Sequence, residues 1–123
     1  MAKVTGLGGV FFRAEDPKAL GLWYKKWLGM PFEDPWGASI PHKDLSGKGN
    51  SVWAPFKRDT KYFGESDQVF MINLMVDDVT EALAQVKEGG AEVIPETEKS
   101  EFGHFGWFVD PEGNRVELWQ PPA

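Results

Sequence analysis

Glu117 is the residue best placed to do chemistry, because its carboxylate lies inside an apolar segment. The flanking Val116 and Leu118 predict a buried strand near the end of the sequence. A carboxylate in such a strand is costly unless it is paired, protonated or bound to a metal. Glu117 is therefore a candidate general base or ligand anchor. The alternatives are an ion pair with Arg13 or Arg115, or simple exposure to solvent.

The two histidines are weaker candidates for a site. His104 precedes a predicted strand, where the mouth of a pocket would lie, and His42 opens a glycine-rich loop. Their spacing is not that of a metal-binding pair. The sequence has no cysteine, which excludes a thiolate zinc site, a disulfide scaffold and a cysteine nucleophile. No serine lies in a nucleophile elbow, and the glycine-rich segments match neither the dinucleotide fingerprint nor the phosphate-binding loop.

Composition and charge narrow the class of protein. The chain has 123 residues, of which 41% are hydrophobic and 26% charged, as expected for one globular domain with a real core. The formal net charge is −6 and no cluster of lysines and arginines is present, so nucleic acid is not an expected partner. No apolar run approaches the roughly 18 residues of a membrane span. The first residues lack the pattern of a secretory signal, so a cytoplasmic location is expected.

The elements that position these residues belong to an internal repeat, so the same order of segments occurs in both halves of the chain. Each half begins with an apolar run, reaches an acidic pair and then enters a helical pattern. Asp16 and Pro17 predict the start of a helix over residues 17–28, which Gly29 ends. Asp78 predicts the cap of a second helix over residues 79–88. The repeat therefore predicts two helices, each preceded by a strand.

Both halves then continue with extended segments. Residues 50–56 (NSVWAPF) end the first half and residues 114–120 (NRVELWQ) end the second, so that Trp53 takes the place of Glu117. Each half reads as a strand, a helix and about three strands, and neither is large enough to be stable alone. The sequence therefore predicts a single domain over residues 1–123. It comprises a first module over about 5–56, a connector over 57–68 and a second module over about 69–121.

Three segments carry a family resemblance: DPKALGLWYKKWLGM, VDDVTEALAQVKEGGAEV and VDPEGNRVELW. With the paired halves, they resemble the vicinal oxygen chelate superfamily of glyoxalases, bleomycin-resistance proteins and extradiol dioxygenases. The resemblance implies an α+β fold in which two βαβββ modules form a curved, partly open mixed sheet. It also implies a homodimer.

In the metal-dependent members of that superfamily, each half supplies two ligands to a divalent metal. The resemblance places these four positions at Gly9, Trp53, Met71 and Glu117. Only Glu117 has a side chain suited to a hard cation, because glycine has no side chain, tryptophan only donates and methionine prefers soft metals. No metal site and no cofactor are therefore expected, and a divalent metal remains the alternative.

Strand alternation predicts which residues line the cup of that sheet. The opposite face, with Val10, Phe12, Ile72, Leu74, Val116 and Leu118, is expected to pack on the helices. The catalytic candidate is Glu117. The expected ligand-binding residues are Phe11, Trp53, Met71, Asn73, Met75, Trp107, Trp119 and His104.

An aromatic cup with few polar groups is the usual composition of a small-molecule site. The first hypothesis is a metal-independent binding protein that holds a small aromatic or cationic ligand, with cations favoured by the net charge. The alternative is a lyase, isomerase or dioxygenase-like enzyme that uses Glu117 as general base. A third hypothesis is a dimeric interaction module without a ligand.

Overall fold

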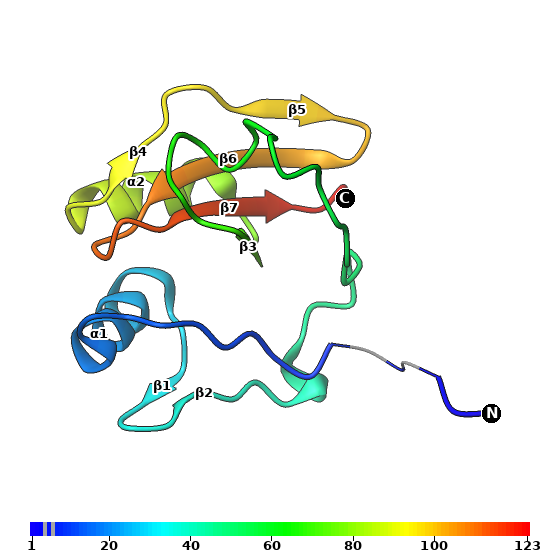
Figure 1. The fold of residues 1–123 in the computed structure, drawn as a ribbon, viewed down its shortest axis with the longest axis horizontal. Helices are drawn as coiled ribbons and strands as arrows, with labels where there is room; N and C mark the ends of the chain where they lie inside the picture. Colours follow the sequence, from blue (N-terminus) through cyan, green and yellow to red (C-terminus); the bar gives the residue numbers. More distant parts are fainter. Residues whose placement is uncertain (4, 6) are drawn as a thin grey trace.

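The structure is a computed structural model that describes residues 1–3, 5 and 7–123. Residues 4 and 6, on either side of the expected start of the first module, lie outside the described residues. The elements follow in the order α1 (Pro17–Leu28), β1 (Phe32–Glu33), β2 (Gly37–Ala38), a 3-10 helix (His42–Asp44), β3 (Ile72–Met75), α2 (Val79–Glu88), β4 (Glu92–Val93), β5 (Glu98–Ser100), β6 (Gly103–Val109) and β7 (Arg115–Gln120) (Figure 1).

The second half of the chain builds one mixed sheet of five strands. Its order is β3-β7-β6-β4, with β5 paired to the other end of β6. β3 runs parallel to β7, whereas the remaining pairs are antiparallel. A tight turn joins β6 to β7, and the Asp110 carboxylate holds it by accepting hydrogen bonds from the backbone N–H groups of Glu112 and Asn114, both at 2.9 Å. The α+β class predicted from the sequence is confirmed.

α2 covers one face of this sheet and closes the core. Asp78 caps the helix, as predicted, by accepting a hydrogen bond from the backbone N–H of Glu81 at 2.9 Å. Apolar residues at helical spacing on α2 face apolar residues at every second position of the strands, as the sequence predicts. The buried cluster consists of Val79, Ala82, Leu83, Val86, Ala91, Phe108, Val116 and Leu118, and Leu74 packs against it.

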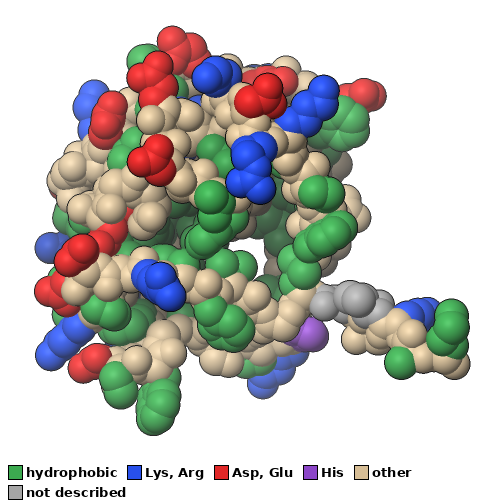
Figure 2. Space-filling model, in the orientation of Figure 1, with side chains coloured by type: hydrophobic (Ala, Val, Ile, Leu, Met, Phe, Trp, Pro, Cys, Tyr) green, Lys and Arg blue, Asp and Glu red, His purple; other side chains and the backbone are tan. Residues whose placement is uncertain are grey.

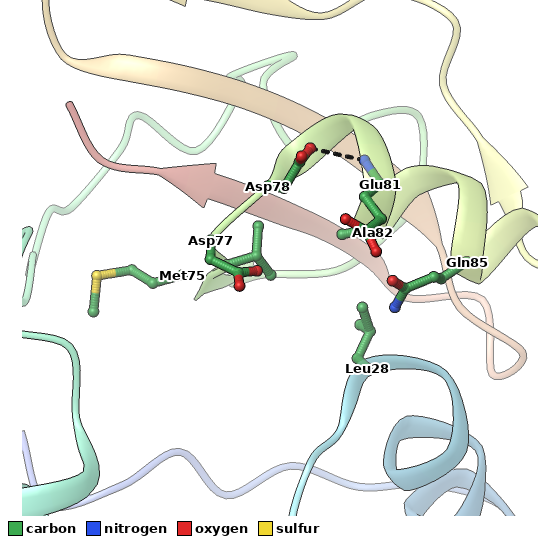
Figure 3. Close-up of a pocket in the computed structure, with 8 residues that line it drawn as sticks. Leu28, Met75, Asp77, Asp78, Glu81, Ala82 and Gln85 are labelled. Carbon is green, nitrogen blue, oxygen red and sulfur yellow. Dashed lines mark hydrogen bonds between the residues drawn. The ribbon is translucent and has the colours of Figure 1, made fainter. Parts of the chain in front are cut away.

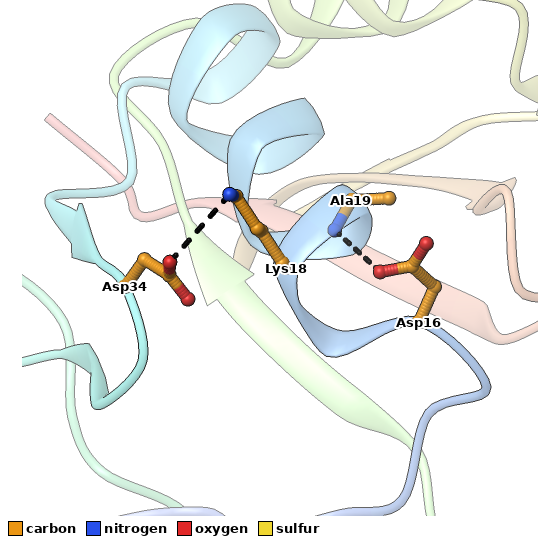
Figure 4. Close-up of polar contacts among 4 residues, drawn as sticks. All are labelled: Asp16, Lys18, Ala19 and Asp34. Atoms are coloured by element: carbon orange, nitrogen blue, oxygen red, sulfur yellow. Dashed lines mark hydrogen bonds and ion pairs between the residues drawn. The ribbon is translucent and has the colours of Figure 1, made fainter.

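α1 lies beside this unit and begins and ends where the sequence predicts. Asp16 caps it by accepting a hydrogen bond from the backbone N–H of Ala19 at 3.0 Å, and Gly29 ends it in the left-handed conformation (Figure 4). An exposed ion pair at 3.8 Å joins Lys18 of the helix to Asp34 after β1. Because both side chains are largely in water, this pair adds little stability.

Hydrogen bonds from α1 fix it to the second half of the chain. The Trp23 indole N–H donates to the carbonyl of Gly89 at 2.8 Å, and the Tyr24 hydroxyl donates to Asp110 at 2.8 Å. Burial, and then the charge and hydrogen bond of Asp110, raise the pKa of Tyr24. The helix is therefore attached through side chains, not through the sheet.

The rest of the first half differs from its prediction. β1 and β2 pair over two residues each, while residues 7–13 and 50–56 contain no strand. Val10 and Phe12, expected to pack on the helices, are 55% and 42% exposed. A strand needs a neighbour to satisfy its backbone, and these segments lie in no hydrogen-bonded ladder among the described residues.

The connector over residues 57–68 crosses the face of the sheet opposite α2 (Figure 1). None of the helices formed by the described residues has the length and apolar character required to cross a bilayer.

Candidate functional site

Glu117 lies at the centre of the sheet face opposite α2, which we call the cup face. The strand register places it between Asn73 on β3 and Trp107 on β6. The Asn73 side-chain amide donates a hydrogen bond to Oε1 of Glu117 at 2.7 Å, and the Trp107 indole N–H donates to Oε2 at 2.9 Å. These bonds show that the three side chains share one face, as the alternation predicts. The Glu117 residue is only 6% exposed.

A third donor reaches Glu117 from the connector. The Tyr62 hydroxyl donates a hydrogen bond to Oε2 of Glu117. The Tyr62 ring meets the Trp107 ring edge-on at 6.0 Å and stacks on Phe56 at 5.6 Å. Burial, together with the hydrogen bond and the charge of Glu117, raises the pKa of Tyr62. The connector is therefore fastened onto the cup face at Glu117.

The partners of Glu117 answer the question that the sequence raises. They are three neutral donors, and such donors stabilise a buried carboxylate without a cation. Neither Arg13 nor Arg115 forms an ion pair with Glu117 in the described part of the chain. The carboxylate forms a structural link between the connector and the sheet. To act as a general base toward a ligand, it would have to release one of these donors.

The four positions that the superfamily uses for metal do not fit a divalent cation here. Gly9, Trp53 and Met71 offer no hard donor, and both oxygens of Glu117 already accept hydrogen bonds. Across residues 1–3, 5 and 7–123, no group of three histidine, cysteine, aspartate or glutamate side chains is placed to hold a metal ion. No step of a mechanism is therefore assigned to a metal.

The far end of the cup face is filled by Trp119, which is 8% exposed. Its ring stacks on Phe105 at 6.0 Å, and its indole N–H donates to the carbonyl of Phe102 at 2.8 Å. Gly49 approaches so closely that a Cβ there would lie 2.6 Å from the Met75 sulfur. The loop of the first half therefore packs against this end of the cup face.

The remaining predicted ligand-binding residues are not gathered in the cup. Phe11 and Trp53 are 92% and 79% exposed, and Met71 is half-buried just before β3. His104 alternates with Phe105 on β6, so it lies on the other face of the sheet, the side of α2. Its Nε2 atom is buried and has no hydrogen-bond partner among the described residues.

A cavity of about 640 Å³ opens between the N-terminal segment and the first residues of β3 and β7. We call it the arginine cavity, after Arg13 and Arg115, which both line it. Figure 2 shows hydrophobic side chains around the hollow between the two parts of the molecule. The lining is Phe11, Phe12, Arg13, Asp67, Gln68, Val69, Phe70, Ile72, Asn114, Arg115 and Val116.

A second hollow, of about 380 Å³, lies between the end of α1 and the start of α2 (Figure 3). Asp77, Asp78 and Glu81 line it together with Leu28 and apolar neighbours. Asp78 is already engaged as the helix cap. The acidic side chains lie where the chain enters α2.

Two features of the site have no signal in the sequence. Nothing in the pattern indicates that the Tyr62 hydroxyl meets Glu117, 55 residues away. Gln68 was not identified at all, although its side-chain amide pairs with the backbone of Arg115.

Comparisons with known proteins agree with this architecture. The family model of the glyoxalase-like domain matches residues 9–119. An integron cassette protein from the mobile metagenome of V. cholerae is 20% identical, with a TM-score of 0.57 over 96% of each chain. A cassette protein from V. pseudocholerae is 20% identical, with a TM-score of 0.52 over 96% of this chain and 95% of the other. TnmS3, an antibiotic-binding protein from Streptomyces sp. CB03234, is 21% identical, with a TM-score of 0.49 over 89% of each chain. At such identities the likeness concerns the fold. No curated protein sequence matches the chain.

Proposed function

Because the chain belongs to the glyoxalase-like domain family, we propose that it is a metal-independent protein that binds a small molecule. The arginine cavity carries this proposal. Its volume of about 640 Å³ lies within the range of roughly 300–1,000 Å³ typical of ligand sites. Apolar side chains from three distant segments of the chain meet there around a few polar groups, as in most such sites.

The ligand we propose is small and partly aromatic. Phe11 and Phe12 line the cavity from the N-terminal segment, and Phe70 lines it from the segment just before β3. Aromatic rings favour offset or edge-on contact with a flat ligand. A cationic ligand, which the net charge favours, is less well supported, because Asp67 is the one carboxylate in this lining.

The cup face serves this proposal as the support of the cavity. Arg115 is the residue they share, since its side chain lies over the Trp107 ring at 5.7 Å and also lines the cavity. The alternative function is an enzyme in which Glu117 is the general base. It requires Tyr62 to leave the carboxylate when substrate enters.

The test is fragment binding followed by NMR. A set of small aromatic compounds is added to the labelled protein, and binders are expected to shift the amide signals of residues 11–13 and 67–70. Phe12→Ala should abolish or greatly weaken these shifts. Phe102→Ala, at an exposed residue outside the cavity, is the matched control and should leave them intact. If no compound shifts these signals, the proposal fails.

Glu117→Gln separates the binding protein from the enzyme. Under the enzyme reading, turnover of a bound substrate would be lost while binding persists. Under the binding reading, ligand affinity would be nearly unchanged and no turnover would be detected in either protein.

We also propose that the protein is located in the cytoplasm, because a chain without cysteine needs no oxidising compartment.

We propose in addition that the protein is a homodimer. Val10, Val52 and Trp53 are more than half exposed although they belong to segments with strand-like sequence. Apolar groups exposed together are typical of interaction surfaces. Sedimentation should give a dimer for the natural sequence and a monomer for Trp53→Lys. Trp36→Lys, which changes an even more exposed tryptophan of the first half, should remain dimeric. A monomeric natural protein would contradict the proposal.

A further inference from the structure

Arg115 is held in place by contacts on both its backbone and its side chain. Its backbone N–H donates to Oε1 of Gln68 at 2.9 Å, and its carbonyl accepts from Nε2 of Gln68 at 3.1 Å. The guanidinium carbon lies 5.7 Å from the centre of the Trp107 ring. A Cβ at Gly64 would lie 2.8 Å from Cδ of Arg115, so the connector packs directly on the side chain. The arginine is therefore pre-positioned.

One nitrogen of this arginine lacks an acceptor among the described residues. The Nε atom of Arg115 is buried and has no hydrogen-bond partner among the described residues. Within the same part of the chain the ion pair found is Lys18 with Asp34, so no carboxylate pairs with Arg115. A buried donor on a permanent charge is costly unless an acceptor meets it. An anion bound in the cavity beside this guanidinium would compensate its charge.

A second arginine lines the same cavity, so the charge of the lining is positive although the net charge of the protein is negative. Arg13 faces the cavity from the N-terminal segment, and Asp67 is the one acidic residue in the lining. Two guanidinium groups therefore oppose one carboxylate in a protein whose net charge is −6. Arginine presents paired N–H groups that match the two oxygens of a carboxylate.

From these observations we infer that the arginine cavity takes a small aromatic carboxylic acid, an inference that rests on the proposed function. The carboxylate meets Arg115 and Arg13, and the ring lies among Phe11, Phe12 and Phe70. The oxygens of the ligand accept hydrogen bonds from the N–H groups of the two guanidinium groups. No covalent step is involved, and the acid binds in its ionised form.

The experiment compares three probes of one shape: benzoate, benzamide and benzamidinium. Calorimetry should give tighter binding of benzoate than of benzamide, and no measurable binding of benzamidinium. Arg13→Gln, at an exposed residue, and Arg115→Gln should each weaken benzoate by about tenfold or more, as expected for loss of a charged hydrogen bond. Both should leave benzamide nearly unchanged. Arg58→Gln changes an exposed arginine of the connector outside the cavity, and it should alter neither probe.

A direct readout follows the Arg115 side chain by NMR. Its Nε–H signal is assigned by its disappearance in Arg115→Gln, and benzoate should shift it while benzamide does not. Equal binding of benzoate and benzamide, unaffected by either arginine variant, would overturn the inference and leave the proposed function intact. Absence of binding by all three probes, with no response at residues 11–13 and 67–70, would overturn both. Tighter binding of benzamidinium would overturn the inference and favour a cationic ligand.

Discussion

Nearly all of the buried core lies in the second half of the chain, while the first half contributes Leu20 and Phe32 among the described residues. The two halves repeat the same order of segments, and both helices form with the expected caps. Only the second half also completes its strands. The contrast is sharpest at the equivalent positions Trp53 and Glu117, which are 79% and 6% exposed.

The difference teaches that a strand-like pattern becomes a strand only where a neighbour is available. β7 lies between β3 and β6, so both edges of its backbone are paired. Residues 50–56 have a similar sequence but no such neighbours in the described structure. Consequently even a carboxylate is buried at Glu117, because surrounding donors compensate it, while an indole remains in solvent at Trp53.

The largest expected effect on stability comes from truncating a large side chain in the core of the second half. Phe108 is fully buried, so Phe108→Ala should lower the free energy of unfolding by about 3–5 kcal/mol. Trp36→Ala, at an aromatic residue of the first half that is 89% exposed, should change it by less than about 0.5 kcal/mol. Urea unfolding measures both. Equal losses would show that the first half is as well packed as the second.

The next effect concerns the link between the halves at Glu117. Glu117→Gln replaces an oxygen acceptor by an amide that donates, so a buried donor of Tyr62, Asn73 or Trp107 loses its partner. The expected loss is about 1–3 kcal/mol. Tyr62→Phe removes one hydrogen bond and should cost about 1 kcal/mol. If Glu117→Gln were neutral in urea unfolding, the carboxylate would not fasten the connector.

One glycine in each half, Gly21 and Gly106, allows the same replacement by alanine to be compared between the halves. A Cβ at Gly106 would lie 2.8 Å from Leu83 and 3.0 Å from Val79, both in the core. At Gly21 it would lie 2.3 Å from the Phe32 ring. We expect Gly106→Ala to cost about 1–3 kcal/mol as overpacking. Gly21→Ala should cost less despite the shorter distance, since Phe32 belongs to a strand of two residues and can move. A larger loss at Gly21, in thermal unfolding, would reverse the comparison.

The smallest effect is a dependence on alkaline pH through Tyr24 and Tyr62, which attach α1 and the connector to the sheet unit. Burial raises the pKa of both hydroxyls, so the folded state favours the neutral tyrosine. The stability this gives is complete below the ordinary tyrosine pKa of about 10 and is lost as pH rises above it. Unfolding measured between neutral and alkaline pH should show the decline. Tyr24→Phe and Tyr62→Phe should each reduce its slope, and an unchanged slope in the double variant would contradict this account.

The sequence predicted what depends on local pattern. Caps at Asp16 and Asp78 marked both helices, and alternation brought Asn73, Trp107 and Glu117 to one face. The Tyr62 bond to Glu117 could not be predicted, because it depends on how a polar connector crosses the sheet. The absence of strands at residues 7–13 and 50–56 also escaped prediction, since pairing depends on neighbours that the local sequence does not specify.

The cavity illustrates the same limit at the level of function. Arg13 and Arg115 are 102 positions apart (115 − 13), so the local pattern could not predict that they line the same cavity. Gln68 fixes the start of β7 by side-chain bonds to backbone, which no periodicity indicates. Charge balance in the lining is therefore a property of the folded chain alone.

The attachment of α1 has a consequence for how the molecule opens. The bond from Tyr24 to Asp110 joins residues 86 apart in sequence, whereas Asp110 closes its own turn within four residues. Because α1 contributes no strand to the sheet, it can separate from the sheet without breaking the hydrogen bonds between β6 and β7. Its amides should therefore exchange with solvent through a partial opening, at a lower free energy than those of β6, which exchange through global unfolding. The protein is then expected to open as two cooperative units of unequal stability, and residues 11–13 of the arginine cavity precede the less stable one.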